Sequence, residues 1–183
     1  MEARDTDGQF KEVMAECRAV FEKKLHDYGA SWRIMRPASL TDQLLIKARR
    51  IRTLEVKKTA MVHEGVRQEF IGLVNYGIVG LIQLERGYAD GVDMGADEAL
   101  EQYIRFAGGA LSLMQRKNHD YGEAWRMMRV SSFTDIILMK IQRVKEMEDL
   151  GGVTIASEGI GANYMDIINY AVFAVIKLSE AGQ

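Results

Sequence analysis

The chain has 183 residues, of which 48% are hydrophobic, so it can bury a sizeable core and is not a disordered chain. Its 24 basic and 26 acidic residues leave a formal net charge of −2, which gives no positive field to hold a nucleic acid polymer. The single cysteine excludes an internal disulfide, the N-terminal segment lacks signal-peptide character, and the most apolar run is too short to span a bilayer. We therefore expect a cytoplasmic globular protein without a membrane partner.

The first predicted element is a helix over about residues 9–25, where apolar residues recur every three or four positions. It ends at the string HDYG, whose glycine is typical of a helix C-terminus. This string has three interpretations. It forms a turn anchored by Trp32, or it delivers polar side chains to a ligand, or it is the His-Asp metal pair of a phosphohydrolase. The last would need further His and Asp ligands, and the chain has only three histidines.

The second helix is predicted to start at Ser39-Leu-Thr-Asp42, an S-x-x-D segment close to a capping box. Lys47 falls inside the apolar stripe of this helix, and Arg50 borders the same face. A half-buried cation calls for an anionic partner, either a carboxylate of the next helix or a bound phosphate. The alternative is that the lysine stem covers the core while the charge reaches water.

The third helix, about residues 64–84, is apolar on most sides and is therefore predicted to be buried. One polar stripe runs along it and contains Glu64, Glu69 and Asn75. A Gly- and Asp-rich segment, 85–98, follows it and is expected to be a linker.

After the linker the same pattern returns. Residues 26–55 and 119–148 are identical at half of their 30 positions, and the third-helix segment recurs at 158–179. The sequence thus predicts an all-α tandem duplication, with copy one over 1–84 and copy two over 99–183. One three-helix unit alone would have a marginal core, so we expect the copies to pack as a pseudo-dimeric helical bundle in one compact domain. A homodimer of the whole chain is left open.

Copy two presents the same candidates, and its stripe carries Asp166 in an otherwise apolar helix. A buried carboxylate must be paired, hydrogen-bonded or bound to a cation, and oxygen ligands on neighbouring helices suit Mg²⁺. The alternative is that the stripe Asn and Tyr residues bond across helices, and that Glu64 and Glu158 favour the helix dipole. Candidates for phosphate or nucleotide binding are Lys47, Arg50, His26, Asp27, Arg36 and Asn75 in copy one, and Lys140, Arg143, His119, Asp120, Arg129 and Asn169 in copy two.

Three repeated motifs identify a family resemblance: K-x-HDYG-x-x-W, then S-x-TD with a later K-x-x-R, then EG with a later NY. With them the chain resembles, over essentially its whole length, the bacterial tandem-repeat family called nucleotide modification associated domain 1. The helix DIINYAVFAVI is also similar to the D-x-x-NYA helix of MazG-like phage proteins, which are all-α NTP pyrophosphohydrolases. That second resemblance implies Mg²⁺, or Mn²⁺ in its place, held by ExxE and ExxD motifs on successive helices.

Transferred to this chain, the ExxD pair falls at Glu69 and Gly72 in copy one and at Asn163 and Asp166 in copy two. Each copy therefore keeps one carboxylate, and the ExxE motif is missing from the second helix. If the copies face each other, the resemblance implies one composite metal and catalytic site. Its metal ligands are Glu69, Glu158 and Asp166, with Glu64 as a further catalytic carboxylate.

Two functions remain open at this point. The resemblance implies a Mg²⁺-dependent hydrolase that releases pyrophosphate from nucleotides, deoxynucleotides or modified nucleotides, with a metal-activated water as the nucleophile. Lys140, Arg143 and Arg129 would hold the phosphates. The alternative is a non-catalytic nucleotide-binding or sensing module whose metal ligands have been lost.

Overall fold

The computed structural model describes residues 5–57, 62–152 and 158–182, the side chains of 62–64 excepted. Within these ranges the chain forms six α-helices and two short 3-10 turns, with no strand. Copy one contains α1 (Thr6–Tyr28), a 3-10 turn (Ser31–Ile34), α2 (Pro37–Lys57) and α3 (Val62–Arg86). Copy two contains α4 (Ala96–Tyr121), a 3-10 turn (Ala124–Met127), α5 (Val130–Asp149) and α6 (Ile160–Ala181). The predicted all-α fold with a duplicated three-helix unit is confirmed.

Both copies end their first helix in the same way, at the glycine of the HDYG string. Gly29 follows α1 with φ 64°, and Gly122 follows α4 with φ 62°. This left-handed conformation costs glycine little, whereas a side chain would be strained there, so the string fixes where the helix stops. At its other end, α1 is capped by Asp5, whose carboxylate accepts a hydrogen bond from the Gly8 amide at 2.9 Å.

The predicted starts of the later helices need correction. α2 begins at Pro37 and α5 at Val130, both two residues before the S-x-x-D segment, so that segment is not a capping box. The proline explains the earlier start of α2, because its fixed φ suits the first helical position and it lacks the amide hydrogen that would go unpaired there. α6 begins at Ile160, so Glu158 lies outside its first turn and is exposed.

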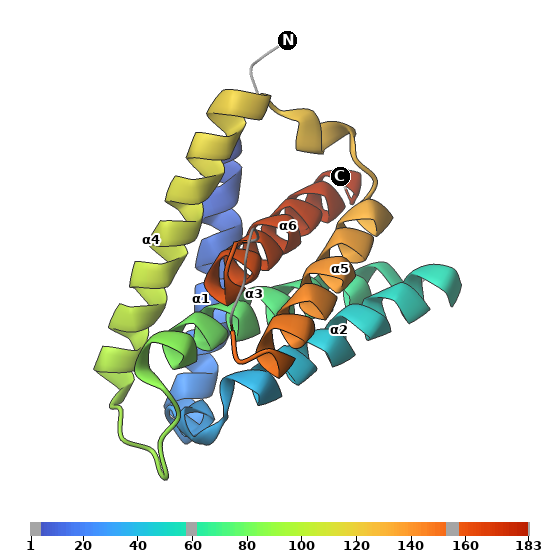
Figure 1. The fold of residues 1–183 in the computed structure, drawn as a ribbon. Coiled ribbons are helices and arrows are strands. Elements are labelled where there is room, and N and C mark those ends of the chain that lie inside the picture. The colour runs from blue at the N-terminus through green and yellow to red at the C-terminus, as the bar shows by residue number, and fades with distance from the viewer. Residues whose placement is uncertain (1–4, 58–61, 153–157, 183) are drawn as a thin grey trace.

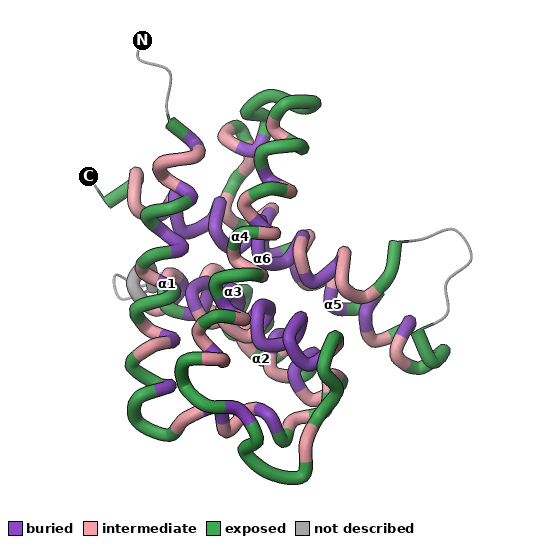
Figure 2. Tube along the Cα trace, turned by 90° about the vertical axis from the view of Figure 1, so that its left-hand side faces the viewer, coloured by how far each residue is buried: buried purple, intermediate pink, exposed green. Residues whose placement is uncertain are grey.

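The core is built from the second and third helices of both copies. α2 packs on α3, α5 packs on α6, and the two pairs meet through contacts of α3 with α6 and of α2 with α5. α3 and α6 are buried along most of their length, as Figure 2 shows. α1 and α4 lie side by side against this group (Figure 1). No helix in the described part of the chain is long and apolar enough to cross a membrane.

Reciprocal bonds between α2 and α5 show that the copies are related by a pseudo-twofold axis. The Thr41 hydroxyl bonds to Glu148 and the Thr134 hydroxyl bonds to Glu55, so equivalent residues contact each other across the two copies. The aspartates that follow these threonines pair in the same reciprocal way: Asp42 with Lys145 at 3.3 Å, and Asp135 with Arg52 at 2.6 Å. The repeated S-x-TD segment therefore joins the two copies.

α1 and α4 each connect one copy to the other. Phe10 at the start of α1 lies edge-on to Phe173 of α6, with ring centroids 6.4 Å apart. Tyr103 of α4 stacks on Phe21 of α1 at 4.5 Å, and its hydroxyl donates to the Asn75 side chain of α3 at 2.7 Å. The duplicated units thus share one core.

Candidate functional site

The clearest polar feature of the buried helices is Asp166, in the middle of α6. Its side chain is 6% exposed. One carboxylate oxygen accepts from Lys117 of α4 at 2.5 Å, and the other accepts from Lys140 of α5 at 2.8 Å. Burial raises the pKa of this carboxyl, but the hydrogen bonds and charges of the two lysines outweigh that effect and hold the pKa below its ordinary value. Asp166 is therefore an ionised link between three helices.

Copy one has the same two lysines but lacks this carboxylate. Lys24 of α1 and Lys47 of α2 stand at the positions of Lys117 and Lys140, while Gly72 of α3 stands at the position of Asp166. A β-carbon added at Gly72 would lie 2.9 Å from Cε of Lys47 and 3.0 Å from its Nζ. The Lys47 side chain therefore lies against the place where the missing side chain would begin.

A cavity of about 520 Å³ lies beside Gly72, between α1, α2, α3 and the first 3-10 turn. Both Lys24 and Lys47 line it, together with the rings of Tyr28, Trp32 and Tyr76. Its remaining walls are largely apolar, and Lys47 Nζ lies 5.4 Å from the centroid of the Tyr76 ring. A cavity of this size with apolar walls and a few convergent polar groups is typical of a small-molecule site.

Two substitutions between the copies explain why this space is open in copy one. The first is Gly72 in place of Asp166. The second is Val79, which lines the cavity with Trp32, where copy two has Phe173. Phe173 stacks on Trp125 with centroids 4.2 Å apart and an interplanar angle of 6°. Copy two thus fills with its own side chains the positions that copy one leaves free.

The other stripe carboxylate, Glu69, also lies between two cations. Its oxygens accept from Lys47 at 3.3 Å and from Arg50 at 3.0 Å, both on α2. Glu69 is 12% exposed at its side chain, whereas Arg50 is 64% exposed. The predicted in-stripe lysines are thus both paired with stripe carboxylates, Lys47 with Glu69 and Lys140 with Asp166. Arg143, the counterpart of Arg50, is exposed.

The predicted metal ligands do not come together. Asp166 and Glu69 each use both oxygens on cationic side chains, and Glu158 lies exposed ahead of α6. The part of the chain that the structure describes contains no group of three or more His, Cys, Asp or Glu side chains that could hold a metal ion. The side chain of Glu64 lies outside the described residues. Glu69 and Asp166 therefore have no oxygen free for a Mg²⁺ ion, because cationic side chains already bond to both oxygens of each carboxylate.

The His-Asp pairs of the repeated string point to solvent in both copies. His26 and Asp27 are 89% and 71% exposed at their side chains, with 3.3 Å between Nδ1 and Oδ1. His119 and Asp120 show the same exposure and the same contact. Neither pair is joined by further acidic or histidine ligands among the described residues.

The remaining predicted residues divide between the surface and the interior. Arg36 is exposed over the ring of Tyr88, 5.8 Å from its centroid, and Arg129 is exposed before α5. Asn75 lines the cavity, but its amide donates to the Cys17 carbonyl and its oxygen accepts from Tyr103. Its counterpart Asn169 is buried with neither polar atom hydrogen-bonded. Asn75 is thus a structural bridge at the cavity wall.

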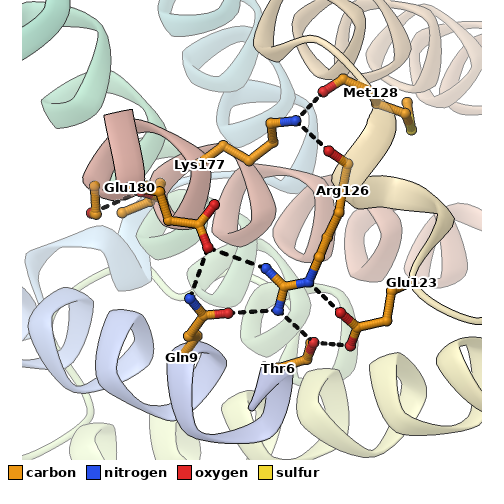
Figure 3. Close-up of polar contacts among 9 residues, drawn as sticks. Thr6, Gln9, Glu123, Arg126, Met128, Lys177 and Glu180 are labelled. Atoms are coloured by element: carbon orange, nitrogen blue, oxygen red, sulfur yellow. Dashed lines mark hydrogen bonds and ion pairs between the residues drawn. The ribbon is translucent and has the colours of Figure 1, made fainter. Parts of the chain in front are cut away.

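The arginine after the tryptophan in each string anchors the 3-10 turn. Arg33 is 5% exposed at its side chain and bonds to Asp93, to Gln83 and to the Gly87 carbonyl. Its counterpart Arg126 contacts Thr6, Gln9, Glu123 and Glu180, as Figure 3 shows.

One further residue in each copy donates hydrogen bonds to the backbone carbonyls at the 3-10 turn. Gln83 donates to three carbonyls in and just after the first turn, those of Trp32, Arg33 and Met35. Lys177 donates to the Arg126 and Met128 carbonyls, in and just after the second turn (Figure 3). The HDYG-x-x-WR string is therefore repeated mainly because each copy needs the same helix stop and the same anchored turn.

A comparison with protein families supports the duplication. A model of nucleotide modification associated domain 1 matches residues 24–84 and 117–178, once in each copy and over about two thirds of the chain. The chain belongs to the nucleotide modification associated domain 1 family. Comparisons with curated proteins and with solved structures gave no match. The further resemblance to MazG-like pyrophosphohydrolases stays a prediction.

In this member of the nucleotide modification associated domain 1 family, the matched segments begin at Lys24 and Lys117. Sequence reasoning missed both lysines, because each lies near the end of a first helix and reads as an ordinary surface residue. It also took Gly72 only as a lost ligand. An alignment of the two copies gives the missing signal. Both copies keep the two lysines, but the aspartate of copy two is replaced by a glycine in copy one.

Proposed function

We propose that the chain is a nucleotide-binding module whose ligand lies in the copy-one cavity beside Gly72. The observation that carries the proposal is that two lysines and four aromatic rings line one cavity of about 520 Å³. Lysine ammonium groups suit a phosphate, and aromatic faces suit a nucleobase of any kind.

The family supports the same choice. Its description associates the domain with nucleotide modification, which agrees in ligand class with a cavity lined by both lysine side chains and aromatic rings. The cavity volume also falls within the range of about 300–1,000 Å³ found for small-molecule sites.

Hydrolysis is a separate question from binding. Mg²⁺-dependent release of pyrophosphate stays a prediction from the MazG-like resemblance. Two of the three carboxylates that would hold the metal, Glu69 and Asp166, are bonded to Lys47, Arg50, Lys117 and Lys140. We therefore give priority to binding without turnover.

The test is calorimetric titration with nucleosides and with their mono-, di- and triphosphates, in Mg²⁺, in Mn²⁺ and in EDTA, with phosphate and pyrophosphate release followed in parallel. We expect saturable binding that survives EDTA, without product. Metal-dependent pyrophosphate release would replace the binding module by the predicted hydrolase. Absence of binding by every nucleotide would overturn the proposal.

A variant tests the location. Val79→Phe should place a ring beside Trp32, as Phe173 stacks on Trp125, and so close the cavity. We expect at least a tenfold weaker affinity with an unchanged far-ultraviolet circular dichroism spectrum. Val79→Leu, a smaller addition, should weaken binding less. Wild-type affinity in the phenylalanine variant would exclude this cavity as the site.

A further inference from the structure

Copy two contains a built-in example of the anion that fits between the paired lysines. The Asp166 carboxylate receives one ammonium group at 2.5 Å and the other at 2.8 Å, and its side chain is almost fully buried. Charge-assisted hydrogen bonds of this length are among the strongest polar contacts in proteins. The arrangement therefore shows which kind of group satisfies this pair of cations.

The equivalent pair in copy one has lost that group. Among the described residues no carboxylate pairs with Lys24, and the carboxylate contact of Lys47 is the longer one to Glu69 at 3.3 Å. Both lysines line the cavity that opens where Gly72 replaces the aspartate. Copy one thus keeps both lysines, but it has an open cavity where copy two has the aspartate side chain.

We infer that the phosphate of a nucleoside monophosphate takes the place in copy one that the Asp166 carboxylate occupies in copy two, bridging Lys24 and Lys47. The inference rests on the proposed function and specifies its ligand. The base and sugar then lie against the aromatic and apolar wall that Trp32, Tyr28 and Tyr76 provide.

The charges around the cavity favour a monophosphate over a triphosphate. Lys24 and Lys47 line the cavity and supply two positive charges, while Glu69 and Arg50, which lie outside its lining, form an ion pair at 3.0 Å and offset each other. A monophosphate carries close to two negative charges at neutral pH, which matches this balance. A triphosphate brings further negative charge toward the Glu69 carboxylate, and like charges at short range repel.

The experiment restores the internal anion to copy one. Gly72→Asp gives copy one the carboxylate of copy two, and Gly72→Asn gives nearly the same shape without the charge. The closest atoms to an added β-carbon belong to the flexible end of Lys47, which can move aside. Both variants can therefore be accommodated, and circular dichroism and thermal unfolding check that they fold.

The readout is the phosphate contribution, defined as the ratio of the dissociation constants of a nucleoside and of its monophosphate. In the wild type we expect a ratio of at least ten, and a triphosphate that binds no tighter than the monophosphate. In Gly72→Asp the ratio should fall close to one, because the new carboxylate takes both lysines and repels the phosphate. Gly72→Asn should retain most of the wild-type ratio.

Three outcomes would overturn the inference while leaving the proposed function intact. The first is a phosphate contribution unchanged in Gly72→Asp. The second is an equal loss of that contribution in the aspartate and asparagine variants, which would mean that the charge is irrelevant. The third is a wild-type triphosphate affinity tenfold or more above that of the monophosphate. Failure of the wild type to bind any nucleotide would instead overturn the proposed function, and the inference with it.

Discussion

The Thr41 hydroxyl of α2 bonds to the Glu148 carboxylate of α5 at 2.5 Å, and the same contact recurs between Thr134 and Glu55 at 2.7 Å. These two bonds lie at the joint between the copies. Burial raises the pKa of both glutamates, and the threonine hydroxyls only partly oppose it. Protonation of these two glutamates therefore favours the folded state, whereas acid usually destabilises a protein.

The first prediction follows from the raised pKa values of Glu55 and Glu148. A carboxyl whose pKa is higher in the folded state binds its proton more tightly there, so the folded state gains stability as the pH falls from the raised pKa toward the ordinary value near 4.5. Compared with the double variant Glu55→Gln/Glu148→Gln, the wild type should gain stability over this window in urea unfolding. An advantage that instead grew as the pH rose would show that these pKa values are not raised.

The second prediction concerns Asp166. Asp166→Asn should lower the free energy of unfolding by about 3 kcal/mol at neutral pH, because it removes the buried carboxylate that pairs with both Lys117 and Lys140. Since the folded pKa is lowered, this contribution is present above the ordinary aspartate pKa and is lost as the pH falls through the folded value.

Asp135→Asn is the matched control for that measurement. Its ion pair with Arg52 is exposed, with 66% and 54% of the two side chains accessible, so we expect a loss below about 1 kcal/mol. Equal losses in the two variants would contradict the account of Asp166 as a buried link.

The third prediction compares the loss of one lysine charge in copy one with the loss of the equivalent lysine charge in copy two. Lys24→Met should weaken nucleotide binding at least tenfold with little effect on stability, because Lys24 lines the cavity and has no ion-pair partner among the described residues. Lys117→Met removes the same charge from copy two, where the lysine holds Asp166. That variant should lose stability and keep its affinity, and the opposite pattern would move the site to copy two.

The fourth prediction distinguishes an anchoring arginine from a surface arginine. Arg33→Met should cost about 3 kcal/mol, because it leaves Gln83, the Gly87 carbonyl and Asp93 without their donor. Arg36→Met removes an exposed side chain over Tyr88 and should cost less than about 1 kcal/mol. Thermal or urea unfolding of both variants measures the difference, and a costly Arg36→Met would make that residue part of the fold.

Much of the architecture could be predicted from the sequence because the same signals occur twice. The apolar spacing, the glycine after each first helix and the repeated S-x-TD segment gave the helices and their order. The capping interpretation of Ser39 and Asp42 was wrong, because Pro37 starts the helix earlier and Asp42 turns toward Lys145 of the other copy. A contact between the two copies cannot be recognised from the spacing of residues along one helix.

The site could be predicted only in part. Lys47 and Lys140 were identified as cations in need of anionic partners, since a charge inside an apolar stripe is visible on a helical wheel. The cavity was missed, because it depends on what Gly72 and Val79 leave unfilled once three helices have packed. The sequence does not tell which way a turn points its side chains, so His26 and His119 are candidates by sequence although both are exposed in the structure.

The chain has two tryptophans, one in each copy, and they allow the central claim to be tested without mutation. Trp32 lines the copy-one cavity, whereas Trp125 is buried beneath Phe173. We would record the two indole N–H signals by nitrogen-proton NMR while adding a nucleoside monophosphate. The account predicts a saturable shift of the Trp32 signal and an almost unmoved Trp125 signal. A shift of Trp125 alone, or no shift at a nucleotide concentration that saturates binding, would contradict it.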